Sequence, residues 1–416
     1  MKILIIANAA VNDTDANGRT LKRLLDCFDK EEKAEFCTYG SPDLSECASF
    51  YRVTDKDALK SLLFWKKHNG VVERSVPAAT ECAADKPTIG KTPFVMLCRE
   101  IVWKLGSWKN AFLKRWLNEV DPDCIFLYLG DNWFTIDLAV WIARRRNIPI
   151  VVYSTEEYPF KDYNYVTKKK SLFYDLWLRR LKRSYIKLDR YAKAGLFNSE
   201  ELTKLYADRY QYRCETLYQS SNIDWSENAK PGKTVSYLGN LGLNRHKALI
   251  DIAKAMHDID PELCLDVYGN ASDKVKNDFS KYENIQLHGF IPYEEVVKVI
   301  HSSSLLIHAE YSDAFYNRDL KYAFSTKITD SVCSGTPLLA YADAGMAFMK
   351  FLSKEGCAFT ATSDGELKET LQKALFNEEE RKKVMDRAFS VRNEFFTANG
   401  RMHQIIEEHL DEGITG

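Results

Sequence analysis

The sequence contains no long hydrophobic run. No apolar stretch in its 416 residues reaches the roughly 18 residues that a membrane-spanning helix needs. The first residues, Met-Lys-Ile-Leu-Ile-Ile-Ala-Asn, also lack the long apolar core and small-residue cleavage site of a signal peptide. We therefore expect a cytoplasmic protein whose membrane contact, if it has any, is peripheral and on the inner face.

Metal-binding cysteine patterns are also missing. The chain has 10 cysteines but no Cys-x-x-Cys pair, and the cysteines show no recurrent spacing with its 8 histidines. They are typical of reduced, buried, small apolar residues. One Asp-x-Asp element, Asp121-Pro-Asp123, follows a helical segment and precedes a strand. It is therefore expected at the amino end of a sheet, where ligands do not bind, and we expect no metal site and no cofactor.

The net charge is close to zero, with 58 basic and 59 acidic side chains. No recognised nucleic-acid module accompanies them, so we expect no nucleic-acid partner.

The chain does have apolar material, with 45% hydrophobic and 12% aromatic residues. This composition excludes wholesale disorder. A chain of this length exceeds one ordinary core and predicts two domains.

Short buried strands alternate with helical segments along the first half. Residues 2–7 form a continuous apolar run, a polar loop follows with Asn17-Gly18-Arg19, and a helical pattern covers residues 20–28. The same alternation recurs at residues 124–129 and 148–153. It predicts a parallel α/β sheet, with each loop at the carboxyl end of its strand.

A second series of strands and helices begins at residue 234, after a polar segment with Pro-Gly at residues 219–233. We interpret that segment as a linker. The predicted fold is α/β, with two Rossmann-like doubly wound domains facing a cleft. The predicted boundaries are residues 1–218 for the N-terminal domain, 234–395 for the C-terminal domain and 396–416 for a C-terminal helix that packs back toward the N-terminal domain.

The first stretch that suggests chemistry is a glycine turn between a predicted strand and a helix. Gly239-Asn240-Leu241-Gly242 precedes Arg245, so backbone N–H groups, a helix N-terminus and a guanidinium are expected to converge. A diphosphate would be stabilised there. A plain glycine turn with solvated basic side chains remains an open alternative, because short glycine motifs are weakly specific.

The second stretch combines a strand end with a capped helix. Glu310 follows the apolar residues 305–309, and Ser325 or Thr326 is expected to cap a helix that begins near Lys327. A hydroxyl, free N–H groups and an ammonium would then face one anion. Asp330, one turn further on, could accept hydrogen bonds from ribose hydroxyls. A capped helix with a solvated carboxylate is the alternative.

These stretches resemble the large retaining glycosyltransferase family usually called family 4, which includes sucrose and glycogen synthases and many bacterial capsule, lipopolysaccharide and teichoic-acid enzymes. The resemblance covers the second domain in order. Its matches are Gly-Asn-Leu with Arg245, Asp266-Val-Tyr-Gly269, Ile285-Gln-Leu-His-Gly289-Phe-Ile-Pro, Glu310, and Lys327 with Asp330 and Gly335-Thr-Pro. It implies the two-domain GT-B fold, with the sugar nucleotide bound mainly to the C-terminal domain.

The resemblance also implies roles for these residues. Arg245 and Lys327 would neutralise the donor diphosphate, Glu310 would contact the donor sugar, and Asp330 would stand where ribose is bound. The remaining donor-binding candidates are Gly18, Gly239, Asn240, Gly242, Ser325 and Thr326. Glu156 and Glu157 occupy the region where family members often have a His, and are candidates for orienting the acceptor; an exposed acidic loop is the alternative.

A metal-independent retaining hexosyltransferase is the activity that the resemblance implies. In such an enzyme the acceptor attacks from the side of the departing phosphate, which takes the acceptor proton. The partners would be a nucleoside-diphosphate sugar and a glycan or lipid-linked acceptor, in the biosynthesis of a cell-surface polysaccharide. The chain departs from the family at Asn240, where Arg is common, and in the insertion after Glu310. A non-catalytic sugar-nucleotide or glycan-binding partner on a degenerate GT-B scaffold is therefore the alternative.

Residues 160–193 suggest a separate surface. They contain eleven Lys or Arg against three Asp, interleaved with aromatic and aliphatic residues. A basic amphipathic helix of this kind suits an anionic membrane surface. A packed helix with snorkelling basic side chains explains the same pattern and is the alternative.

Overall fold

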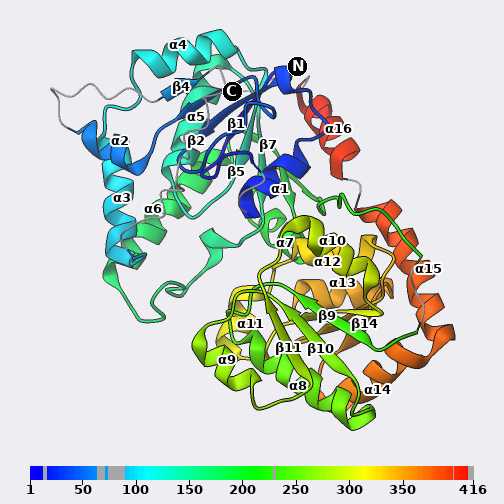
Figure 1. Ribbon diagram of the computed structural model, residues 1–416. Coiled ribbons are helices and arrows are strands. Elements are labelled where there is room, and N and C mark those ends of the chain that lie inside the picture. Colours follow the sequence, from blue (N-terminus) through cyan, green and yellow to red (C-terminus); the bar gives the residue numbers. More distant parts are fainter. Residues whose placement is uncertain (13–15, 63–70, 74–89, 228–230, 397, 411–416) are drawn as a thin grey trace. The chain divides into compact units, whose positions relative to one another are not determined.

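The computed structural model describes residues 1–12, 16–62, 71–73, 90–227, 231–396 and 398–410 (Figure 1). It divides the chain into two compact units. Unit 1 comprises Met1–Leu217 together with the C-terminal residues from Ala398, and unit 2 comprises Tyr218–Thr397. Each unit is an α/β layer structure around its own sheet.

The sheet of unit 1 has the strand order β4-β3-β2-β1-β5-β6-β7-β8. All neighbouring strands pair in parallel except β4, which is antiparallel to β3. Strands β1, β2 and β6 are buried along their whole length, which is expected for a parallel sheet covered on both faces. The strands are β1 Ile3–Ile6, β2 Lys33–Cys37, β3 Ser49–Arg52, β4 Val71–Glu73, β5 Cys124–Tyr128, β6 Ile150–Ser154, β7 Ala192–Phe197 and β8 Arg213–Thr216.

Helices cover both faces of this sheet. Helices α1 and α16 contact each other and share one core with β1, β5 and β7, while α3, α5 and α6 pack together on β5 and β6. The helices of unit 1 are α1 Ala16–Leu24, α2 Asp55–Lys60, α3 Pro93–Leu105, α4 Ala111–Val120, α5 Phe134–Arg146, α6 Leu172–Leu188, α7 Glu200–Ala207 and α16 Ala398–Leu410, with short 3-10 turns η1 Lys30–Glu32 and η2 Tyr158–Phe160.

Unit 2 has a six-stranded, fully parallel sheet in the order β11-β10-β9-β12-β13-β14. Helices α8 and α14 pack on one core, and α12, α13 and α15 contribute to a second. The strands are β9 Thr234–Leu238, β10 Cys264–Tyr268, β11 Ile285–Gly289, β12 Leu305–Ala309, β13 Leu338–Tyr341 and β14 Phe359–Ala361. The helices are α8 Arg245–Ile259, α9 Asp273–Phe279, α10 Tyr293–Ser302, α11 Ala314–Leu320, α12 Thr326–Cys333, α13 Ala347–Glu355, α14 Asp364–Phe376 and α15 Glu378–Phe395.

The predicted α/β fold class is confirmed, whereas one helix was placed wrongly from the sequence. The pattern over residues 20–28 predicted a helix after a loop at Gly18, but α1 spans Ala16–Leu24 and Gly18 lies in its first turn. A Cβ on Gly18 would clash with Asn12 and with the carbonyl of Ala10, so the close approach of the β1 loop explains the glycine.

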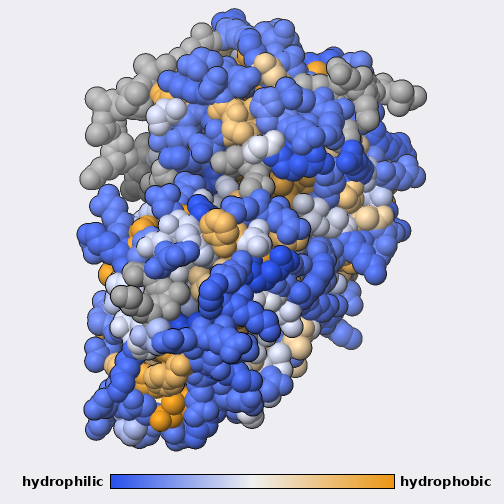
Figure 2. Space-filling view, turned by 90° about the vertical axis from the view of Figure 1, so that its right-hand side faces the viewer, coloured by the Kyte–Doolittle hydropathy of each residue, from blue (hydrophilic) through white to orange (hydrophobic). Residues whose placement is uncertain are grey.

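In both sheets the order of connection reverses beside the first strand of the unit. β1 lies between β2 and β5, and β9 lies between β10 and β12. Crevices outside the carboxyl ends of strands at such reversal points are where ligands of doubly wound sheets bind. One side of the molecule is mostly hydrophilic, with small separate hydrophobic areas (Figure 2).

Candidate functional site

The turn after β9 brings the start of α8 to the reversal point of the unit 2 sheet. The hydroxyl of Tyr237 donates to the carbonyl of Asn240 at 2.8 Å, and the side-chain oxygen of Asn240 accepts from the backbone N–H of Gly242 at 2.6 Å. Leu243 and Asn244 then adopt the left-handed conformation, with φ of 57° and 61°. These bonds hold a tight turn that ends where α8 begins, at Arg245.

An ion pair joins the start of α8 to the end of β12. The Nε atom of Arg245 donates to both carboxylate oxygens of Glu310, at 2.9 and 2.8 Å, and Nη2 lies 2.7 Å from Oε1. Glu310 is 5% exposed, and its backbone N–H donates to the carbonyl of Tyr341 at 3.0 Å. Burial opposes the charge of Arg245, but the hydrogen bonds and charge of Glu310 outweigh it and raise the pKa of the guanidinium.

Lys327 lies on the other side of the same turn, in the first turn of α12. Its Nζ is packed so closely on Gly239 that a Cβ there would collide with it, and it lies 5.6 Å from the centre of the Tyr237 ring. Burial and the nearby charge of Arg245 lower the pKa of the Lys327 ammonium from 10.5 to about 8, although Glu310 acts in the opposite direction. The ion pairs of the described residues include none to Lys327.

His308 and Tyr237 belong to this site, and the sequence reasoning missed both. His308 is 4% exposed, its Nε2 is 3.9 Å from Oε1 of Glu310, and its ring meets Phe348 edge-on at 5.0 Å. Burial, then Lys327 and Arg245, lower the pKa of His308 well below its ordinary value, so its imidazole is neutral at pH 7. The alternation of β12 pairs residues 308 and 310 on one face, which is the signal that could have identified His308.

The start of α12 has the cap that the sequence predicted. Ser325 is the N-cap, and its hydroxyl accepts from the backbone N–H of Lys327 at 3.3 Å, while Thr326 is the first helical residue. Asp330 lies one turn further and accepts a 2.7 Å hydrogen bond from the hydroxyl of Ser221. Arg245, Glu310, Lys327, Gly239 and Tyr237 are thus brought together, whereas Asp330 is engaged with the segment that leads into unit 2.

The candidate acceptor residues lie in unit 1, after β6, and differ from each other. Glu157 is 5% exposed and pairs with the buried Lys161, at 2.8 Å between Oε1 and Nζ. Glu156 is more exposed, with its Oε2 3.5 Å from the same Nζ. Because burial and pairing occupy Glu157, Glu156 is the carboxylate better placed to meet a ligand from solvent.

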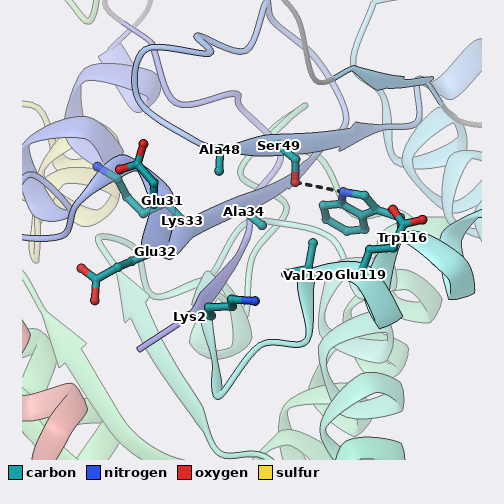
Figure 3. A pocket seen from close by; sticks show the side chains of 10 residues that line it. All are labelled: Lys2, Glu31, Glu32, Lys33, Ala34, Ala48, Ser49, Trp116, Glu119 and Val120. Carbon is teal, nitrogen blue, oxygen red and sulfur yellow. Dashed lines mark hydrogen bonds between the residues drawn. The ribbon is translucent and has the colours of Figure 1, made fainter.

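A cavity of about 250 Å³ occurs elsewhere in unit 1 (Figure 3). Its lining includes Lys2, Ala34 and Ser49 at the beginnings of β1, β2 and β3, and Trp116 of α4. Trp116 donates from Nε1 to the hydroxyl of Ser49 at 3.2 Å (Figure 3). This hollow lies at the amino ends of the strands, whereas ligands of such sheets bind at the carboxyl ends, so we do not place the site there.

The described residues contain no group of three or more His, Cys, Asp or Glu side chains arranged to hold a metal ion. Asp121 caps the end of α4 and pairs with Arg146 at 2.9 Å, and Asp123 accepts from the backbone N–H of Lys2 at 2.7 Å.

Among the residues that the structure describes, no helix is both long and apolar enough to cross a membrane.

Comparison with known proteins finds a family match that falls within unit 2. Residues 220–391 match the family model of glycosyl transferases group 1. Unit 2 thus resembles a group 1 glycosyltransferase domain over nearly its whole length. No curated protein matches the chain by sequence. Within the matched residues, Arg245, Glu310 and Lys327 surround the reversal point of the sheet.

Solved structures extend the likeness to the whole chain. HepE from Anabaena, in complex with UDP, has a TM-score of 0.65 at 11% identity, covering 99% of this chain and 100% of that one. The lipopolysaccharide outer core galactosyltransferase WaaB has a TM-score of 0.56 at 13% identity, covering 97% and 99%. UGT2 of Phytolacca americana, complexed with UDP-2fluoro-glucose and pterostilbene, has a TM-score of 0.54 at 10% identity, covering 99% and 100%. These likenesses show that the chain has the GT-B fold.

Proposed function

We propose that the protein is a retaining glycosyltransferase that moves a hexose from a nucleoside-diphosphate sugar to a glycan or lipid-linked acceptor, in the biosynthesis of a cell-surface polysaccharide. One observation supports this most directly. A half-buried ammonium, that of Lys327, lies at the start of α12 beside the guanidinium of Arg245, with a single carboxylate, Glu310, between two cations. Because His308 is neutral, this group carries a net positive charge that a diphosphate would neutralise.

The expected chemistry follows from this excess of positive charge. As the bond between the anomeric carbon and the phosphate oxygen breaks, the phosphate keeps the electron pair and gains negative charge. Cations fixed at that oxygen stabilise the transition state more than the ground state. The acceptor oxygen bonds to the anomeric carbon and its proton passes to the departing phosphate oxygen, so the enzyme need supply neither a nucleophile nor a metal ion.

Glu310 and Tyr237 have positioning roles in this proposal. Glu310 holds the Arg245 guanidinium through both carboxylate oxygens, and Tyr237 supports the turn and underlies Lys327. Prior orientation of both cations reduces the entropy lost when the donor binds. Glu310 is also placed at the carboxyl end of β12, where a donor sugar would meet it.

Replacing Lys327 tests the assignment. Lys327→Ala should lower the rate of sugar transfer about a hundredfold, because one positioned charge at a developing anion is worth on the order of 3 kcal/mol. Lys254→Ala removes an exposed cation from α8 in the same domain and should leave the rate unchanged. The donor is first selected by the melting-temperature shift that each of a panel of nucleoside diphosphates produces.

Two results would reject parts of the proposal. A folded Lys327→Ala protein with full transfer activity and donor affinity would show that the site is elsewhere. Binding of a sugar nucleotide with no hydrolysis or transfer above background would instead indicate a non-catalytic binding protein on the same fold.

A further inference from the structure

Helices α3 and α6 of unit 1 pack side by side (Figure 1), and each carries exposed apolar side chains. The rings of Phe94 and Phe173, near the beginnings of the two helices, meet edge-on at 5.1 Å. Of the apolar residues that the sequence suggested for a membrane surface, Tyr174, Trp177 and Tyr185 are buried. The exposed apolar side chains of α6 lie on its opposite face, and α3 supplies more of them.

The uncovered face of α3 is an apolar stripe. Phe94, Ile101 and Leu105 are 54%, 43% and 65% exposed, at spacings that place them along one side of the helix. Glu100 is the only acidic residue in α3, and it is buried, where it accepts from the backbone N–H groups of Trp133 and Phe134. The stripe therefore carries no exposed negative charge.

The uncovered face of α6 combines apolar and basic side chains. Leu172, Leu176, Arg179, Arg183 and Ile186 follow one another at steps of four and three residues, and all five are exposed. Such steps keep them on one face of a helix. This face has both parts of an interfacial helix, aliphatic side chains that can enter a lipid layer and guanidinium groups that can meet phosphates.

A basic tip precedes α6. Lys168, Lys169 and Lys170 are exposed. The side chain of Asn164, itself 7% exposed, donates to the hydroxyl of Thr167 at 2.6 Å and to the carbonyl of Lys169 at 2.8 Å. The lysines are thus presented by an ordered loop, at the end of the helix that also carries Leu172.

We propose that the outer faces of α3 and α6, with the basic tip at residues 168–170, form a docking surface for an anionic lipid bilayer. Exposed apolar side chains that gather on two adjacent helices and are rimmed by polar residues are typical of interaction sites. Here the apolar side chains are accompanied by cations, with Asp175 the only acidic residue of α6. An anionic membrane surface matches both features, because each cation near it contributes binding in addition to the buried apolar area.

The surface begins at the end of the unit 1 sheet where the acceptor is expected. The hydroxyl of Tyr165, just before the basic tip, donates to Asp131 at 2.6 Å, and Lys91, just before α3, pairs with the same carboxylate. Asp131 follows β5, at the carboxyl edge of the sheet. A lipid-linked acceptor could therefore stay anchored in the bilayer while its head group reaches the carboxyl edge of the sheet. This role for the acceptor rests on the proposed function, whereas the docking surface itself does not.

Vesicle binding tests the surface independently of sugar transfer. The full chain is sedimented with vesicles of phosphatidylcholine alone and with vesicles containing phosphatidylglycerol. Binding should favour the anionic vesicles. Arg179→Ala with Arg183→Ala should weaken that binding about 25-fold, since each cation contributes about fivefold. A matched double variant on α15, Lys382→Ala with Lys383→Ala, should bind as the original chain does.

A second pair of variants separates the apolar contribution. Ile101→Glu with Leu105→Glu should abolish binding to both kinds of vesicle, whereas Phe376→Glu, which charges an exposed residue at the end of α14 in unit 2, should not. Circular dichroism checks that each variant is folded. Lys327→Ala should bind vesicles normally, so loss of activity and loss of docking are distinguishable.

Two results would overturn the proposal. One is equal binding of the original chain and the α3 and α6 variants. The other is that the original chain does not bind vesicles but forms a dimer in analytical ultracentrifugation, and that the Ile101→Glu, Leu105→Glu double variant is a monomer. This face would then join two copies of the protein.

Discussion

The lowered pKa of Lys327 leads to a prediction about how donor binding depends on pH. A diphosphate beside the ammonium restores the missing counter-charge, so binding should raise the pKa of Lys327 from about 8 toward its ordinary value. Only the protonated lysine binds strongly. At pH 8 about half of the free protein carries this proton, and at pH 9 about one molecule in ten does. The apparent affinity should therefore be about twofold lower at pH 8, and about tenfold lower at pH 9, than at neutral pH.

Isothermal titration calorimetry measures this linkage directly. Titrations in two buffers that differ in ionisation enthalpy give the number of protons taken up, which should be about 0.5 at pH 8 and about 0.9 at pH 9. The range above pH 7.5 is suitable because phosphate groups with pKa values near 6 are then already ionised.

Lys327→Arg is the control, since a guanidinium stays charged throughout this range. Its affinity should be independent of pH and its proton uptake close to zero. If the unchanged protein binds with constant affinity from pH 7.5 to 9 and takes up no proton, then Lys327 does not meet the diphosphate as we infer.

Three further predictions concern stability and geometry. Below pH 8 the Lys327 ammonium is charged in both folded and unfolded chains and folding buries it. Lys327→Met should therefore raise the free energy of unfolding at pH 7 by about 1–3 kcal/mol, a gain that fades as the pH rises from 8 toward 10.5; urea denaturation at pH 7 showing no gain would contradict this. Glu310→Gln leaves Arg245 and Lys327 without their shared counter-charge and should cost about 3–5 kcal/mol of stability, partly restored by a nucleoside diphosphate in thermal melts; a melting temperature equal to that of the original chain would contradict it. Gly239→Ala puts a methyl group where the Lys327 Nζ lies, so it should displace this ammonium and lower the rate of sugar transfer by up to roughly a hundredfold. Gly400→Ala, which meets no atom within 4 Å, should leave the rate unchanged; similar rates for the two variants would count against this packing.

Strands β1, β5, β6 and β12 were predictable because each is a short, mostly apolar run bounded by loops. Strands β2 and β8 were not predicted, because charged residues interrupt their apolar pattern. The cap at Ser325 was predictable for a similar reason, since a hydroxyl before a helical pattern is a local signal. The start of α1 was not, because Asn17 and Gly18 disfavour a helix although Ala16 favours one, and the contact of Gly18 with Asn12 and Ala10 is tertiary.

The partners inside the site depend on the fold and so could not be read from spacing. Arg245 and Glu310 are 65 residues apart in sequence, and only the neighbouring positions of β9 and β12 bring them together. The pairing of Glu157 with Lys161 was missed although they are four residues apart, because nothing in the sequence shows that both side chains are buried.

The place of α16 in unit 1 has a consequence for biosynthesis. Met402, Ile405 and Ile406 are part of the same core as β1 and β7, although all of unit 2 is translated between them. Until the ribosome has released α16, the part of the N-terminal core that α16 covers remains exposed to water as apolar surface. Unit 1 is thus the first to be made and the last to be finished, and a chaperone that shields this patch would find it throughout synthesis of unit 2.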